Sequence, residues 1–202
     1  MGKIILASQS PRRRQLLEQM GITDFAVCPA RGEEDMGAQL PPDRLSEALA
    51  LAKAREVAAQ ARPEDLIIAA DTIVTLNHQV LGKPHSREEA VSMLETLSGR
   101  SHVVYTGLAV LRGGETVSDH EATEVRFRPL SREEIAAYVD TGEPMDKAGA
   151  YGIQGRGALL VEGIQGDYSA VVGLPVCRLG RILLDFGVDC LALSAGREED
   201  SL

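Results

Sequence analysis

The sequence predicts an α/β protein in which a mixed, twisted sheet is flanked by helices. Two observations carry this prediction. Segments typical of strands and helices alternate along the first half of the chain. The middle of the chain holds two β-rich runs on either side of Gly113-Gly114, which predicts a hairpin. Together these features favour a mixed sheet covered by helices.

Local signals mark most of the individual elements. Ser10 and Pro11 form an N-cap and first-turn pair that opens a helix after the apolar strand KIILAS, and Gly21 stops this helix. Ser-x-x-Glu capping boxes open two further helices at Ser86 and Ser131. Apolar patterns predict the remaining elements, which are strands over 25–30, 66–76, 102–111 and 117–127 and helices over 43–61 and 175–186.

Length and composition fit one medium-sized domain. The chain has 202 residues, of which 44% are hydrophobic, so a sizeable core can form. We expect a single domain over residues 1–190 and a flexible tail over 191–202. The net charge of −9 argues against a nucleic-acid partner, which would call for a basic surface.

The cysteines and the N-terminus favour a cytoplasmic protein. Three widely spaced cysteines contain no CxxC pair, so they predict neither a disulfide framework nor a zinc site. The N-terminus lacks the pattern of a signal peptide. No stretch approaches the roughly 20 apolar residues that a membrane helix needs, so we expect no membrane partner.

Three arginines begin the first predicted helix. Positive charge at residues 12–14 opposes the helix dipole, whereas a bound anion would reverse that cost. Ser8 and Ser10 place hydroxyls beside the same helix start, which favours a phosphate site. The alternative is that the arginines are ordinary solvated surface charges.

Asp71 lies within the apolar run LIIAADTIV. A buried carboxylate is costly unless it is paired, hydrogen-bonded or bound to a metal. A turn or capping aspartate is the alternative, but the β-rich run continues past Asp71, which favours a functional role. Glu33, Glu34 and Asp35 lie on a predicted loop and are solvated unless they converge on Asp71, where they could help to hold a divalent cation.

Two glycine-rich segments and one short turn complete the candidate site. DKAGAYGIQG and GIQGDYSAVVGLP indicate close backbone approach to a ligand, although ordinary loops use glycine as well. Lys83, in the turn GKP, could direct its ammonium group at a phosphate. The phosphate loop of nucleotide kinases, the dinucleotide fingerprint, HExxH and GxSxG motifs are all missing from the sequence.

Five segments in the same order resemble the Maf family, whose members are related to inosine-triphosphate pyrophosphatases. The resemblance covers about residues 3–187, and the ordered set is far more specific than any one segment. It implies an elongated, two-lobed fold with a central cleft, and hydrolysis of a nucleoside triphosphate to the monophosphate and pyrophosphate. The segments are ASQSPRRRQLL, the Glu-rich loop, LAKA, AADTIV with LGKP, and DKAGAYGIQG with GDYSAVVGLP.

The resemblance implies roles for the charged candidates. Asp71 matches the proton acceptor, and Lys53 and Lys83 match basic positions that bind the triphosphate. Glu34, together with Asp71, is expected to hold a divalent metal cation, magnesium or manganese. The loop reads ARGEED, so Glu33 stays open as the alternative ligand.

The resemblance also implies how the substrate is bound. Ser8, Arg12 and Arg13 fall on the phosphate-binding SxSPRR motif. Arg12, Thr72 and Gln154 match positions linked to base choice, and GAYGIQG resembles the branch that acts on dTTP and UTP rather than on 7-methyl-GTP. The Gln154 amide offers a donor and an acceptor that match the O4 and N3–H of thymine or uracil.

Other functions remain as alternatives. The family's name, taken from an inhibitor of septum formation, suggests a non-catalytic nucleotide-binding regulator of cell division. A phosphomonoesterase or a kinase is a second alternative, and the missing phosphate loop disfavours the kinase. The expected partner is a small nucleoside triphosphate, and both a monomer and a homodimer stay open.

Overall fold

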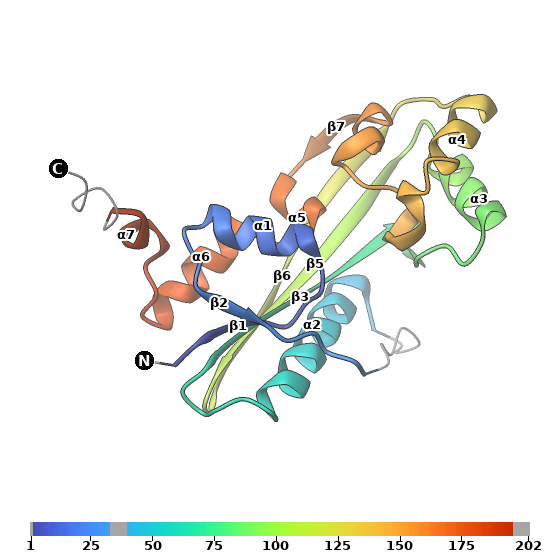
Figure 1. Cartoon of the computed structure of the whole chain (residues 1–202). Helices are drawn as coiled ribbons and strands as arrows, with labels where there is room; N and C mark the ends of the chain where they lie inside the picture. Colours follow the sequence, from blue (N-terminus) through green and yellow to red (C-terminus); the bar gives the residue numbers. More distant parts are fainter. Residues whose placement is uncertain (1, 33–39, 196–202) are drawn as a thin grey trace.

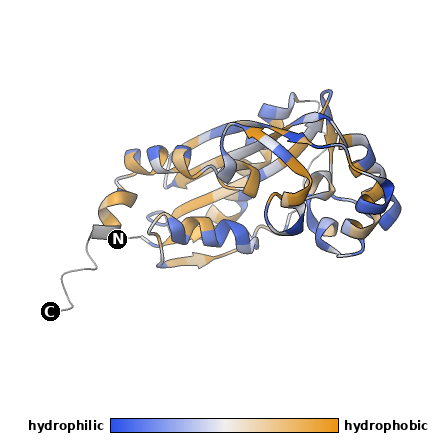
Figure 2. Ribbon diagram, turned by 90° about the horizontal axis from the view of Figure 1, so that it is seen from above, coloured by the Kyte–Doolittle hydropathy of each residue, from blue (hydrophilic) through white to orange (hydrophobic). Residues whose placement is uncertain are grey.

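The structure is a computed structural model that describes residues 2–32 and 40–195. It confirms the predicted fold class, a mixed α/β arrangement of one sheet flanked by helices. The molecule is elongated along its long central strands (Figures 1 and 2). Within the described ranges, no helix combines the length and the apolar character needed to cross a membrane.

One seven-stranded sheet organises the molecule, in the order β2-β1-β3-β5-β6-β7, with β4 paired to β3. The pairs β1–β2 and β1–β3 are parallel, and all other pairs are antiparallel. The predicted hairpin around Gly113-Gly114 joins the two long strands β5 and β6. The strands are β1 (Ile4–Leu6), β2 (Phe25–Val27), β3 (Leu66–Leu76), β4 (Gln79–Leu81), β5 (Ser101–Arg112), β6 (Glu115–Phe127) and β7 (Val161–Gln165).

Helices cover both faces of this sheet. They are α1 (Pro11–Gln19), α2 (Pro42–Ala58), α3 (Arg87–Leu97), α4 (Arg132–Val139), α5 (Tyr168–Val172), α6 (Val176–Asp185) and α7 (Cys190–Ala195). Three 3-10 helices, η1 (Glu143–Asp146), η2 (Ala148–Ala150) and η3 (Gly155–Leu159), follow α4. Of all these strands and helices, β4, β7, α5, α7 and the 3-10 helices were not anticipated from the sequence, because they are short and carry weak periodic signals.

The predicted helix starts have clear physical causes. The Ser10 side chain accepts a hydrogen bond from the Arg13 N–H, and Pro11 occupies the first helical turn. Ser131 and Glu134 form the full capping box. At α3 only half of the predicted box is present, because Glu89 accepts from the N–H of His85 instead of that of Ser86.

The side-chain alternation of β3 separates the hydrophobic cores. Ile68 and Ala70 face α1 and α6, whereas Ile67 and Ala69 face α2 on the opposite side of the sheet. Farther along β3, Val74 packs under α3 and α4. Helices α1 and α6 therefore cover one end of a sheet face and α3 and α4 the other end, as Figure 1 shows. This arrangement gives the two expected lobes, which share the long strands.

A gap in strand pairing lies between the lobes. On one edge of β3, β1 pairs with 66–68 and β4 pairs with 74–76. Along the other edge, β3 pairs with β5 over the whole span from Ile67 to Thr75. The stretch 69–73 of β3 consequently has one edge without a strand partner among the described residues, and side chains from both faces of the strand can reach the opening there.

The chain after α6 contains one further helix, α7, over residues 190–195. The single domain over 1–190 and the flexible tail over 191–202 stay predictions. Residues 196–202 lie outside the described part of the chain. Cys28, Cys177 and Cys190 are free thiols.

Candidate functional site

A cleft of about 800 Å³ opens at the gap along β3, between the two lobes. The start of α1 forms one wall, and the segment from η1 to η3 forms the opposite wall. Every predicted site residue within the described ranges lines this cleft, from five separate parts of the chain. These residues are Ser8, Arg12, Arg13, Lys53, Asp71, Thr72, Lys83 and Gln154.

Arg13 is held firmly at the base of the cleft. Its Nε donates to the Gly173 carbonyl oxygen at 2.7 Å. Its two terminal nitrogens donate to the Ser8 and Thr72 hydroxyls at 3.3 and 3.2 Å. The planar guanidinium thus joins α1, β3 and the turn after α5, and a fixed arginine fork of this kind suits phosphate recognition.

The Thr72 hydroxyl has defined hydrogen-bond roles. Thr106 donates to the Ala170 carbonyl oxygen at 2.7 Å, so its only hydroxyl proton is used there. In the 3.0 Å contact between the two threonines, Thr72 must therefore be the donor. Because Thr72 also accepts from Arg13, it can offer a ligand an acceptor lone pair but no proton.

Asp71 is buried and forms an ion pair with Lys53, through the Lys53 Nζ and one carboxylate oxygen. The two residues come from β3 and α2, on the sheet face opposite α1. A buried carboxylate with a nearby ammonium is charge-compensated, which makes its burial tolerable. The other predicted metal ligands, Glu34 and the alternative Glu33, lie outside the described residues.

The remaining predicted residues lie on the walls of the cleft. Arg12 is 4.0 Å from the Asp146 carboxylate on the opposite wall, an ion pair that bridges the two lobes. Lys83 follows β4 and is exposed, and Gln154 is exposed at the start of η3. Lys83 and Gln154 are more exposed than Asp71, which is buried but still lines the cleft.

The wall opposite α1 contains three charged residues and a tyrosine to which the sequence patterns assign no role. Glu143, Asp146, Lys147 and Tyr151 all line the cleft. Lys147 Nζ donates to the Glu143 carbonyl oxygen at 2.5 Å and to Asp146 at 2.6 Å. Glu143 precedes the glycine-rich segment DKAGAYGIQG, and Asp146 is its first residue. In the sequence both look like ordinary solvated charges, and only their contacts in the structure set them apart.

Several glycines of this wall are explained by the protein's own packing. A Cβ at Gly149, where φ is +68°, would lie 2.9 Å from a Val74 methyl carbon. One at Gly152 would lie 2.8 Å from the Lys147 side chain. The close backbone approach expected from the sequence is present here, but it is made to neighbouring side chains.

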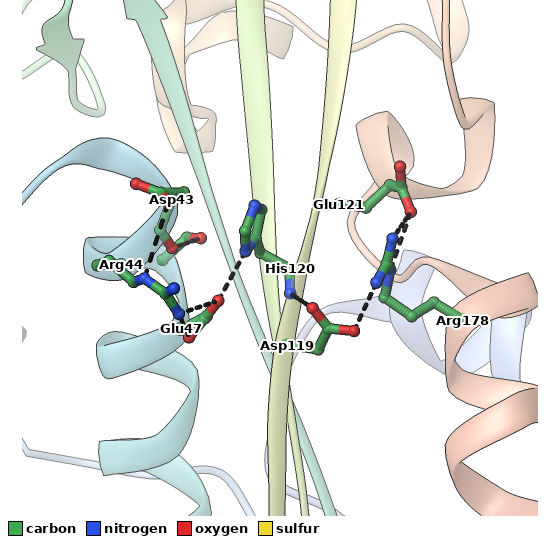
Figure 3. A network of polar contacts seen from close by, with 8 residues as sticks. Asp43, Arg44, Glu47, Asp119, His120, Glu121 and Arg178 are labelled. Atoms are coloured by element: carbon green, nitrogen blue, oxygen red, sulfur yellow. Dashed lines mark hydrogen bonds and ion pairs between the residues drawn. The ribbon is translucent and has the colours of Figure 1, made fainter.

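A second polar cluster lies outside the cleft lining, between α2, β6 and α6 (Figure 3). His120 Nδ1 is 2.6 Å from Glu47, and Arg178 is 2.5 Å from Asp119. Ligand atoms of Glu47, Asp119 and His120 lie within 4.8 Å of one another and could hold a metal ion. Both carboxylates already have arginine partners, since Arg44 lies 3.1 Å from Glu47. These residues are different from the predicted metal ligands.

Known proteins that are similar to this chain over nearly its whole length share one name. Proteins called dTTP/UTP pyrophosphatase are 55% identical in Moorella thermoacetica, with 94% of this chain and 97% of the relative covered, and 53% identical in Symbiobacterium thermophilum, with 97% and 100% covered. A relative of the same name in Bacillus anthracis is 50% identical, with 94% and 98% covered.

A solved structure shares the fold. The HAM1 protein of Coxiella burnetii superposes with a TM-score of 0.53 at 19% identity, covering 92% of this chain and 100% of that one. At this identity the likeness concerns the fold alone. Residues 3–186 match the family described as Maf-like protein. With that match and with relatives more than half identical over nearly their whole length, this chain belongs to the Maf-like protein family.

Proposed function

We propose that this protein is a nucleoside triphosphate pyrophosphatase that hydrolyses dTTP and UTP to the monophosphate and pyrophosphate. The observation that carries the proposal is a buried carboxylate, Asp71, surrounded by basic side chains in one cleft of about 800 Å³. A small nucleotide fits a cleft of this size. The activity named for the relatives from Moorella and Symbiobacterium supports the same reaction.

The basic residues bind the triphosphate. Arg13 is fixed by Ser8, Thr72 and the Gly173 carbonyl, so its position is set before substrate arrives. Lys83 is exposed on the rim and is free to swing toward an incoming phosphate. Positive charge held in this way stabilises the charge that develops on the departing pyrophosphate.

Asp71 acts as the proton acceptor for the attacking water. Its carboxylate is kept in place by β3 and by the ion pair with Lys53. A positioned base of this kind removes a proton as the water attacks the α-phosphorus, and the bond to the bridging oxygen breaks to release pyrophosphate. Lys53 balances the charge of Asp71 within the buried site.

A divalent cation, magnesium or manganese, fits the chemistry of these donors. The Asp71 carboxylate supplies hard oxygen atoms in a cleft that also receives phosphate oxygens. Asp71 and Glu34 would hold the ion, which would polarise the phosphoryl group and lower the pKa of a bound water. The Glu47–Asp119–His120 group is separate from this cleft.

Arg12, Thr72 and Gln154 select the base of the nucleotide. Thr72 offers only an acceptor, and the Gln154 amide offers both a donor and an acceptor. These groups match the N3–H and O4 of thymine or uracil. A base with a different pattern leaves polar groups unpaired, and such sites discriminate strongly.

Product analysis tests the proposal. Purified protein is incubated with dTTP, UTP, dATP, GTP and 7-methyl-GTP, and the products are separated. We expect monophosphate and pyrophosphate from dTTP and UTP, with kcat/KM well above that for the purine nucleotides. Release of inorganic phosphate, or nucleotide binding without turnover, would contradict the proposal and favour a phosphomonoesterase or a non-catalytic regulator.

The same assay tests the metal. We expect turnover to need magnesium or manganese and to stop when a chelator removes all divalent ions. Undiminished turnover after complete chelation would remove the metal from the proposal while leaving the bond cleavage intact.

A further inference from the structure

The Glu143 carboxylate gathers three donors from the wall of the cleft that carries Gln154. Its Oε1 accepts from the Tyr138 hydroxyl at 2.9 Å and from the Gly157 N–H at 3.0 Å. Its Oε2 accepts from the Arg156 N–H at 3.0 Å. The Glu143 side chain of η1 therefore fixes the backbone at the beginning of η3.

The Tyr138 hydroxyl extends this contact to the other side of Gln154. It donates to Glu143 and accepts from the Gly152 N–H at 3.2 Å. Tyr138 is a buried residue of α4, so its ring cannot follow movements of the cleft surface. The backbone is thus fixed at 152 and at 156–157, on both sides of the exposed Gln154.

The protonation states of Glu143 and Tyr138 strengthen their hydrogen bonds to the loop backbone. Burial alone would raise the pKa of the Glu143 carboxyl, but the Gly157 and Arg156 N–H groups, the Tyr138 hydroxyl and the Lys147 charge together hold its pKa below the usual range. Burial raises the pKa of the Tyr138 hydroxyl, which keeps its proton. At neutral pH an ionised acceptor faces three donors, and hydrogen bonds of this type are stronger than neutral ones.

Steric fit makes the arrangement sensitive to small movements. A Cβ at Gly155, where φ is +67°, would lie 2.8 Å from the Glu143 carboxylate. A Cβ at Gly157 would lie 2.0 Å from the Gly152 carbonyl oxygen and 2.8 Å from the Tyr138 hydroxyl. The loop is therefore packed directly onto Glu143 and Tyr138, with glycine at the tight positions 155 and 157.

We propose that Glu143 and Tyr138 are positioning residues that set base selectivity by fixing the 152–157 loop and, with it, the Gln154 amide. The proposal rests on the proposed pyrophosphatase function. Gln154 itself is exposed at the cleft, so the aim of its amide depends on where the loop backbone is held. Discrimination by hydrogen bonds needs donors and acceptors placed to within a fraction of an ångström. The proposed tail-binding residues Ser8 and Arg13 lie at the start of α1, on the opposite wall, so their hold on the triphosphate should not depend on this pair.

The test separates base selectivity from tail binding in Glu143→Gln and Tyr138→Phe. Glu143→Gln replaces one acceptor oxygen by an NH₂ group that opposes the backbone N–H donors. Tyr138→Phe removes only the hydroxyl and preserves the buried ring. We measure kcat and KM for dTTP and dATP, and the inhibition constant of inorganic tripolyphosphate as a probe of the tail site.

In each variant we expect the ratio of kcat/KM for dTTP over dATP to fall roughly tenfold, the effect of losing about one charge-assisted hydrogen bond. The loss should appear mainly in KM for dTTP, and tripolyphosphate inhibition should stay within about twofold of the wild type. Glu162→Gln and Tyr168→Phe are matched controls, because both side chains are exposed and outside the cleft lining, and they should behave as the wild type.

The outcomes distinguish the two proposals. Wild-type protein that releases no pyrophosphate, or does not prefer dTTP, overturns the proposed function and this inference with it. A wild-type enzyme that prefers dTTP, with variants that keep the same preference, overturns only the positioning role. Equal losses of selectivity and of tripolyphosphate affinity would indicate general damage to the cleft and would likewise contradict it.

Discussion

At the scale of single residues, the cleft combines charges that are fixed in advance with charges that can move. Among the described residues, Arg13 donates hydrogen bonds to partners from three parts of the chain. Asp71 is buried beside Lys53, whereas Lys83 is exposed. Side chains that are already held in place bind a transition state without a further ordering cost. We therefore propose that Arg13 and Asp71 serve the chemical step and that the exposed Lys83 serves substrate capture.

Replacing Asp71 by asparagine tests the chemical step at this scale. The amide has nearly the same size but cannot accept a proton at neutral pH, so we expect turnover of dTTP to fall by roughly 10²–10⁴-fold. Folding, followed by thermal melting, and nucleotide binding should persist. Asp24→Asn is the matched control, since Asp24 is exposed outside the cleft lining. A variant with most of its turnover would remove Asp71 as the base, and one that no longer folds would favour a structural role for Asp71.

At the scale of elements, the site depends on how closely α2 approaches the sheet. Gly107 on β5 lies opposite Asp71 on β3 in the strand register. A Cβ at Gly107 would lie 2.0 Å from the Ser46 carbonyl oxygen of α2, so the helix backbone rests directly on the strand there. Lys53 is on the same helix, two turns farther along. The contact therefore helps to set the distance between Lys53 and Asp71.

Gly107→Ala tests this contact. The added methyl group collides with backbone, which cannot rotate away, so we expect a loss of about 1–3 kcal/mol in the free energy of unfolding, measured by urea denaturation. Turnover should fall as well, because α2 carries Lys53 away from Asp71. Gly163→Ala on β7 is the matched strand control, since nothing lies within 4 Å of its Cβ position. Equal stability of the two variants would show that α2 adapts freely.

At the scale of the whole molecule, two lobes with separate cores share one sheet, and the cleft occupies the space between them. His102 lies deep in the lobe formed by α3 and α4, where its ring contacts Phe127 and Tyr151 edge to face. Its Nε2 is 2.8 Å from the Tyr151 hydroxyl. Because Tyr151 lines the cleft, the stability of this lobe and the shape of the site are linked.

The global stability should therefore depend on pH through His102. Burial lowers the pKa of His102 from 6.5 to about 4. At a pH below the pKa of 6.5 that His102 has in the unfolded chain, the unfolded chain binds a proton that the folded chain does not. The free energy of unfolding therefore falls as the pH drops from 6.5 toward 4. We expect a loss of about 2 kcal/mol between about pH 7.5 and pH 5, measured by urea denaturation. His102→Gln should have a flatter profile over this interval, and an unchanged slope would contradict the assignment.

Particular residues show how far the sequence could predict the site. The sequence points to Asp71 because a carboxylate in an apolar strand is costly to bury unless it has a partner. It points to the arginines because their positive charge at a helix start opposes the helix dipole unless an anion binds there. Nothing in the sequence indicates Glu143 or Tyr138. A single glutamate in a polar segment and a tyrosine in a helix carry no motif that separates them from surface or core residues. Their significance lies in contacts with residues 152–157, which no spacing rule links to them.

The sequence by itself determined the elements whose signals are local, such as the helices opened by Ser10 and Ser131 and the long strand around Asp71. Hydrophobic periodicity and end capping act over a few residues, so they can be detected without a structure. Only the tertiary structure decided which edge of β3 stays open, how α2 rests on Gly107, and which wall faces α1. These features depend on strand register and on packing between residues far apart in the chain, and such contacts form only when the whole fold is assembled.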